Sequence, residues 1–156
     1  MMLEEYISTY GLDTGDTYCD LQEVYYAIEF KNVTTENTVN AAIEDLNESP
    51  HDPEALAALQ DAGADLWEVA MTRSLFNELL GPLVDDPEAA EAMAFISEMN
   101  DQLSLVYGEM LATTSSARDL SVSLTALQES DSTRAYYEGQ ADAYSTLDGY
   151  RNQRCE

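Results

Sequence analysis

The sequence predicts an all-α protein, a helical bundle that contains a long antiparallel helical hairpin and a long helix with heptad patterning. Apolar residues recur at i, i+3, i+4 and i+7 in almost every segment, whereas no segment alternates cleanly between apolar and polar residues as a strand would. Between residues 96 and 127, nine of ten a and d positions in five successive heptads are apolar. Asp-Pro pairs at 52–53 and 86–87 are typical helix starts. The length of 156 residues favours one domain, residues 1–156.

The N-terminal part, residues 1–50, is expected to form short helices. The first should end at Gly11, before a polar loop. A second helix should end near Asn32, where Thr34 or Thr35 can cap a third.

Residues 53–129 are expected to form the helical hairpin, with Gly81-Pro82 ending its first helix. At 1.5 Å per residue, a second helix over 87–129 would extend for about 65 Å, farther than a compact bundle of this chain length. We therefore expect another subunit to cover part of its apolar seam. The alternative is that the seam packs inside the chain's own bundle.

Residues 132–156 are expected to form a C-terminal helix and tail that act as an interaction segment. They hold three of the six basic residues and four tyrosines, and Tyr and Arg are enriched at interface hot spots. Together with the seam they give a candidate partner interface: Trp67, Leu103, Met110, Leu120, Leu124, Leu127, Tyr136, Tyr137, Tyr144, Tyr150, Arg151 and Arg154. The alternative is that the Tyr and Arg side chains pack within the chain.

Acidic residues dominate the charge, because 31 Asp and Glu stand against 6 Lys and Arg and give a formal net charge of −25. Such a surface repels phosphate, which argues against direct nucleic-acid binding and against anionic membranes. No apolar run is long enough for a membrane span, and the first residues lack the pattern of a signal peptide. The dispersed acids and the preference for Arg over Lys look like proteins of salt-in halophiles, in which molar salt screens repulsion and supplies diffuse cations.

Two short motifs suggest chemistry that their context does not support. The Asp-Thr-Gly tripeptide at 13–15 is that of aspartic proteases, but no second copy supplies the partner aspartate. Glu48-x-x-His51 matches a di-iron bundle motif, but the chain has one histidine and Pro50 interrupts the helix. We therefore expect no enzyme activity, no catalytic residue, no cofactor and no specific metal site.

Two features concern covalent modification. Cys19 and Cys155 lie far apart in the sequence and neither has a nearby cysteine, so reduced thiols are expected, with an intersubunit disulfide left open. Asn32 and Asn47 stand in formal glycosylation sequons, and whether they are modified is also left open.

Four features carry a resemblance to small helical head–tail adaptor or connector proteins of tailed viruses that infect halophilic archaea. They are the compact helical N-terminal half, the turn GPLVDDP, the long heptad helix and the tail RAYYEGQADAYSTLDGYRNQRCE. The resemblance implies a non-catalytic virion subunit that forms homo-oligomers and contacts other structural proteins. The alternative expectation is a cytoplasmic helical regulatory protein of a halophilic archaeon that binds a partner.

Overall fold

Helices form the whole architecture over residues 2–155, the part of the chain that this computed structural model describes. No strand occurs among those residues, so the all-α prediction is confirmed. The elements are α1 (Leu3–Tyr10), α2 (Thr17–Asp20), α3 (Gln22–Glu48), α4 (Pro53–Leu80), the 3-10 helix η1 (Gly81–Leu83), α5 (Pro87–Met99), the π-helix η2 (Asn100–Ser104), α6 (Leu105–Thr113), α7 (Ala117–Gln128) and α8 (Asp131–Cys155). Within residues 2–155, none of these helices has the length and apolar character of a membrane span.

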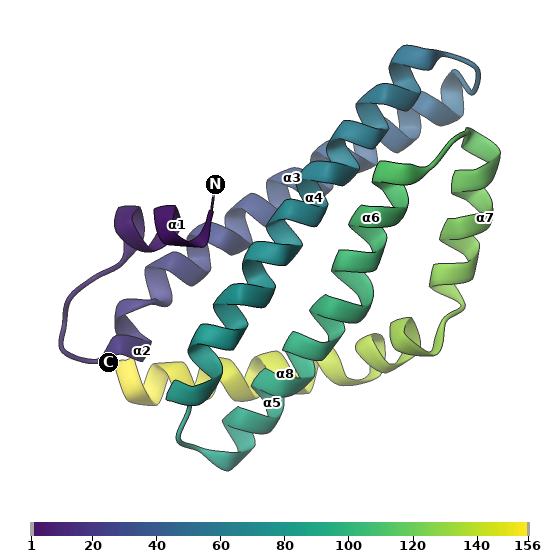
Figure 1. The fold of residues 1–156 in the computed structure, drawn as a ribbon. Coiled ribbons are helices and arrows are strands. Elements are labelled where there is room, and N and C mark those ends of the chain that lie inside the picture. Colours follow the sequence, from purple (N-terminus) through teal and green to yellow (C-terminus); the bar gives the residue numbers. More distant parts are fainter. Residues whose placement is uncertain (1, 156) are drawn as a thin grey trace.

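The two longest helices, α3 and α4, form an antiparallel hairpin that runs the length of the bundle (Figure 1). At the start of α4 the Asp52 side chain accepts a hydrogen bond of 3.0 Å from the Glu54 backbone N–H, and Pro53 occupies the first turn. The Asp-Pro start is therefore confirmed here, because the pair satisfies an orphan donor and fixes a helical φ.

Helix α3 continues past the point where a helix end was predicted. The sequence placed an end near Asn32 and a new cap at Thr34 or Thr35, but α3 is unbroken to Glu48. The hydroxyls of Thr34 and Thr35 donate to the Lys31 carbonyl at 3.0 and 2.7 Å. Both hydroxyls are satisfied inside the helix, so neither residue needs to end it.

The stretch predicted as one helix over 87–129 is divided. It runs through α5, η2 and α6 and then breaks at Thr114, whose backbone is extended. Ser116 caps α7 by accepting a hydrogen bond from the Asp119 backbone N–H, and α7 folds back beside α6 (Figure 1). The prediction of a continuous rod is therefore wrong, because the Thr-Thr-Ser-Ser run at 113–116 favours caps over helix interior.

Helix α4 makes its most extensive contact with α6, and two glycines permit the close approach. A Cβ atom on Gly63 would lie 2.5 Å from the Ala112 nitrogen, and one on Gly108 would lie 2.6 Å from the Trp67 nitrogen. Both distances are shorter than van der Waals contact with backbone atoms, so only glycine fits either position.

Two hydrophobic clusters occupy opposite ends of the bundle. The terminal cluster, near the two chain ends, contains Leu3, Tyr6, Tyr18, Leu21, Val24, Ile28, Phe76, Leu80, Ala89, Ala92, Met93, Ile96, Ala143 and Leu147. The turn cluster, near the α3–α4 turn, contains Val39, Ala42, Leu46, Leu59, Ala62, Leu66, Leu111 and Leu120. The heptad seam contributes Ile96 to the first cluster and Leu120 to the second. Most other seam positions are half-buried, while Val106 and Thr113 are exposed.

The end of α8 is fastened to the N-terminal region by a group that we call the C-terminal clasp: Asp16, Cys19, Tyr150, Arg154 and Cys155. Cys19 and Cys155 form a disulfide with a Cα–Cα distance of 5.4 Å, which corrects the expectation of two reduced thiols. Arg154 donates to both carboxylate oxygens of Asp16, at 2.9 and 3.2 Å. Helix α8 crosses the bundle beside α5 and brings the distant cysteines together (Figure 1).

Candidate functional site

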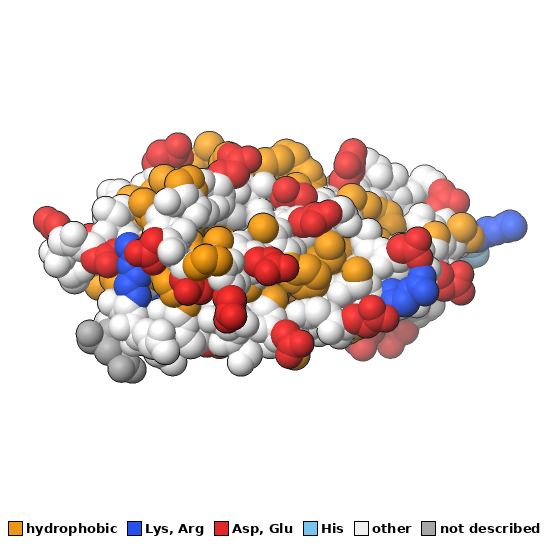
Figure 2. Space-filling view, turned by 90° about the horizontal axis from the view of Figure 1, so that it is seen from below, with side chains coloured by type: hydrophobic (Ala, Val, Ile, Leu, Met, Phe, Trp, Pro, Cys, Tyr) orange, Lys and Arg blue, Asp and Glu red, His pale blue; other side chains and the backbone are white. Residues whose placement is uncertain are grey.

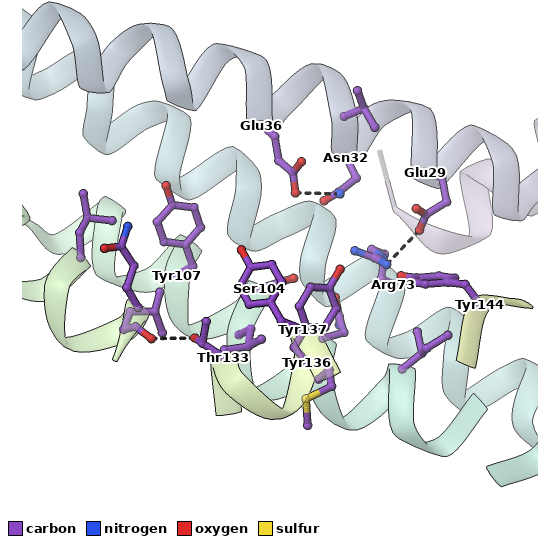
Figure 3. A pocket seen from close by; sticks show the side chains of 18 residues that line it. Glu29, Asn32, Glu36, Arg73, Ser104, Tyr107, Thr133, Tyr136, Tyr137 and Tyr144 are labelled. Carbon is purple, nitrogen blue, oxygen red and sulfur yellow. Dashed lines mark hydrogen bonds and ion pairs between the residues drawn. The ribbon is translucent and has the colours of Figure 1, made fainter. Parts of the chain in front are cut away.

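A cavity of about 490 Å³, which we call the central cavity, lies between the terminal cluster and the turn cluster. Its walls come from α3 on one side and from α7 and α8 on the other, while α5, η2 and α6 supply much of the remaining lining. This volume is within the range of small-molecule sites in proteins. Figure 3 shows polar side chains from α3, α4 and α8 directed into it.

A partly buried ion pair lies at one side of the central cavity. Arg73 Nη2 is 3.1 Å from Glu29 Oε1, and the Arg73 side chain is largely buried (Figure 3). Burial alone lowers the pKa of Arg73, but the charge of Glu29 and the charge and hydrogen bond of Tyr144 outweigh it, so the net pKa is raised. Arg73 therefore stays charged, and its charge is already matched by Glu29.

Two buried asparagines line the cavity with unsatisfied acceptors. Asn32 and Asn100 are 6% and 4% exposed. Their amide nitrogens donate to Glu36 Oε1 at 3.2 Å and to the Ala70 carbonyl at 3.0 Å, respectively. Neither Oδ1 has a hydrogen-bond partner among the described residues. Both oxygens are also shielded from water, so each is a buried acceptor that costs stability in this conformation.

Tyrosines and aliphatic side chains complete the lining. Burial raises the pKa of Tyr107 and that of Tyr136, so both hydroxyls stay protonated at neutral pH and can donate hydrogen bonds. Tyr144 lies beside Arg73, while Tyr137 is largely exposed. The aliphatic part consists of Val33, Ile96, Met99, Leu103, Leu124 and Leu127.

The π-helix η2 contributes Asn100, Leu103 and Ser104 to this lining. It continues α5 into α6 without a break in the helical path but with the wider i to i+5 hydrogen-bond pattern. Single π-turns of this kind are frequent at functional sites, because the extra residue redirects side chains that a regular helix would place elsewhere.

The structure brings half of the predicted partner-interface residues together around this cavity. These six are Leu103, Leu124, Leu127, Tyr136, Tyr137 and Tyr144. Their shared location, which sequence spacing alone did not indicate, arises because α8 returns past η2 and α7.

The other predicted interface residues lie elsewhere. Leu120 is buried in the turn cluster and Met110 packs against it, so Leu120 is not available to a partner in this conformation. Trp67 is exposed on α4, where its backbone faces Gly108.

Tyr150, Arg151 and Arg154 make their contacts within the chain. The Arg151 guanidinium lies 4.5 Å from the centre of the Tyr25 ring. Tyr150 donates a hydrogen bond of 2.8 Å to Asp85 and also accepts one from Arg154. These contacts hold α8 in place.

Sequence reasoning missed the polar residues of the cavity. Asn32 was considered as a sequon and as a helix end, yet it is buried within α3. Arg73 and Asn100 were not singled out. Arg73 offered a signal, because it stands in a mainly apolar helical stretch, whereas Asn32 and Asn100 have polar and charged neighbours in the sequence.

The two motifs weighed for catalysis lie away from this site. The Asp-Thr-Gly tripeptide at 13–15 is in the exposed loop before α2, and His51 is exposed in the α3–α4 turn. Among residues 2–155, no group of three or more His, Cys, Asp or Glu side chains is arranged to hold a metal ion. The central cavity itself combines an ion pair with tyrosine hydroxyls and apolar walls.

Comparison with known proteins gives no match. Neither the models of known protein families, nor the curated protein sequences, nor the solved structures match this chain.

Proposed function

We propose that the chain is a non-catalytic assembly subunit of a halophilic virus particle, a head–tail connector or adaptor that forms an oligomer with neighbouring virion proteins. The observation that carries this proposal is an exposed apolar row on α3: Tyr26, Phe30 and Val33, which are 51%, 72% and 52% exposed. Their spacing of i, i+4 and i+7 places them on one helix face. Tyr137 on α8, which is 70% exposed, lines the same cavity as Val33.

The α3 apolar row lies on a surface whose charged side chains are mostly acidic. Figure 2 shows one face of the molecule with acidic side chains scattered across it and few basic ones. Large aromatic side chains left in water on such a protein favour a partner surface, because Tyr and Phe are enriched at interfaces and charged residues are depleted from interface cores.

The charge supports a high-salt setting for that assembly. Copies that each carry −25 repel one another at low ionic strength. In about 1 M salt the screening length falls to about 3 Å, so the apolar contact can dominate. Assembly should therefore strengthen as salt rises, opposite to the behaviour of an interface held by ion pairs.

The Cys19–Cys155 disulfide favours a particle over the cytoplasm. Disulfides persist on virion surfaces and in other oxidising environments, whereas cytosolic thiols are kept reduced. The second candidate, a cytoplasmic regulatory protein of a halophilic archaeon, uses the same α3 apolar row for one partner but leaves the disulfide without a role.

The test measures molar mass by light scattering after gel filtration, from about 0.1 M to about 3 M KCl. We expect a salt-dependent oligomer for the unaltered chain and its loss in Phe30→Asp. The matched control is Val122→Asp, which places the same charge at an exposed apolar position on α7. A monomer at all salt concentrations, or equal losses in both variants, would contradict the proposal.

A further inference from the structure

We propose that the chain exchanges residues 117–155, which form α7 and α8, with a second copy of itself and so makes a domain-swapped dimer. In the dimer the break at Thr114 becomes helical, α6 and α7 form one continuous helix, and α8 packs on the partner as it packs here on its own chain. This inference does not depend on the assembly proposal, because it uses the α6–α7 break and not the α3 apolar row.

The break between α6 and α7 contains no residue that prevents a helix. Residues 113–116 read Thr-Thr-Ser-Ser, without the Gly or Pro that ends many helices. Thr114 and Ser116 have extended backbones, with ψ angles of 139° and 163°. Rotation about the backbone bonds of this short segment is enough to join α6 and α7 into one helix, as a hinge loop does in domain swapping.

The heptad repeat continues in register across the break. Thr113 and Ala117 stand on its two sides with the spacing of successive d and a positions in an unbroken repeat. A continuous helix would therefore align the α6 and α7 parts of the seam on one face. The folded-back chain packs that seam incompletely, because Val106 is 47% exposed, Thr113 is exposed, and Met110 and Leu124 are half-buried.

The orientation of α6 leaves its part of the seam facing away from α4. Gly108 lies against the backbone of Trp67 on α4. Val106 and Met110 are each two residues from Gly108, about 200° around the helix, so they lie on the opposite face. In the folded-back chain α7 lies beside α6 (Figure 1). In the dimer the partner's α7 takes that place, so the contacts between α6 and α7 re-form between chains.

The C-terminal clasp distinguishes the two forms covalently. Cys155 belongs to the exchanged segment and Cys19 to the part that stays. Their disulfide therefore lies within one chain in the folded-back form and between two chains in the dimer. The Asp16–Arg154 ion pair likewise re-forms between chains. Once the bridge has closed, the chain keeps the form in which it closed.

Mixed-isotope refolding tests the proposal. Equal amounts of unlabelled and isotope-labelled chains are reduced, unfolded and refolded in about 2 M KCl at increasing protein concentration. Oxidised glutathione accepts the two electrons and two protons that each pair of thiols loses. Mass spectrometry then measures the fraction of Cys19–Cys155 pairs that join a labelled to an unlabelled chain. We expect this fraction to rise with protein concentration, together with a covalent dimer on a non-reducing gel. Equal amounts of Cys19–Cys19 pairs would indicate random cross-linking and would contradict the proposal.

Variants at the break shift the expected result in opposite directions. The hinge variant Thr114→Ala/Ser115→Ala/Ser116→Ala removes the α7 cap and favours a continuous helix, so it should raise the mixed fraction at least about threefold. Ser115→Pro should lower it by a similar factor, because proline interrupts a continuous helix. Thr114, which precedes this proline, is already extended, as a residue before proline prefers.

Two controls separate the exchange from other effects. Ser121→Ala/Ser123→Ala/Thr125→Ala replaces the same residue types within α7 and should leave the mixed fraction unchanged. Phe30→Asp, which tests the α3 apolar row, should also leave it unchanged, so the two proposals can fail separately. Only intrachain pairs in the hinge variant at every protein concentration, or equal increases in the hinge variant and the α7 control, would overturn the proposal.

Discussion

Removing the Cys19–Cys155 disulfide should destabilise the fold more than any other single change to the C-terminal clasp. The bridge joins residues 136 positions apart, so it closes nearly the whole chain into one loop. In the folded protein the two Cα atoms are 5.4 Å apart, within the ordinary range for a disulfide. In the unfolded protein the bridge removes many extended conformations, and this loss of entropy is the main source of the expected stabilisation.

The magnitude follows from the loop length. For a loop of 136 residues, the chain-entropy relation gives about 5 kcal/mol at 25 °C. In a domain of this size each kcal/mol shifts Tm by about 2–4 °C, so loss of the bridge should lower Tm by about 10–20 °C. The Asp16–Arg154 ion pair is partly exposed and cannot replace this contribution.

Thermal unfolding followed by circular dichroism in high salt measures the effect. Cys155→Ser and Cys19→Ser should lower Tm equally, and a reductant should lower the Tm of the unaltered chain to the same value. The double variant, which has no thiols, is the control and should not respond to reductant. A decrease in Tm of less than about 3 °C would refute the entropic explanation, because the bridge would then not restrict the unfolded chain as calculated.

Three further predictions concern packing and pH. Gly108→Ala places a Cβ atom against the α4 backbone and should lower the free energy of unfolding, measured with urea, by about 1–3 kcal/mol. Gly149→Ala, in open space on α8, should raise it by about 0.5–1 kcal/mol. Burial, followed by the charge of a nearby glutamate, raises the pKa of Tyr25 to about 12, so stability present below about pH 10 is lost as pH rises towards 12. Tyr25→Phe should remove this alkaline loss from unfolding curves measured between those values. The hydrogen bond from Arg154 lowers the pKa of Asp16. The interaction of the ionised Asp16 with Arg154 therefore stabilises the fold above about pH 4, and this stability is lost as the pH falls. Arg154→Gln should make the free energy of unfolding depend less on pH in this acidic range.

Local signals predicted most helix boundaries because they act within a few residues. Asp52-Pro53 and Asp86-Pro87 start α4 and α5 as expected, since the Asp side chains accept hydrogen bonds from the first turn of each helix. The same reasoning failed at Thr34 and Thr35, where hydroxyls that could cap a helix bond instead to a carbonyl in the preceding turn. A capping residue is thus a signal that the neighbouring helical contacts can override.

The candidate site was predictable only in part. The sequence identified its apolar and Tyr components, such as Leu103, Leu127 and Tyr136, through heptad spacing and composition. It gave no sign that Asn32 and Asn100, which lie 68 positions apart, line one cavity. Polar residues on different helices carry no shared periodicity, so their meeting depends on how the helices cross.

By itself, the sequence determined that the chain is helical, acidic and divided at its Asp-Pro and Gly-Pro signals. These properties follow from hydrogen bonds, side-chain periodicity and charge within one or two helical turns. Tertiary structure alone decided that the heptad seam is divided between helices that fold back on one another, that Cys19 meets Cys155, and that a cavity separates two hydrophobic clusters. The physical reason is that a reversal at residues 114–116 and the crossing of α8 set these distances, and neither is encoded in local periodicity.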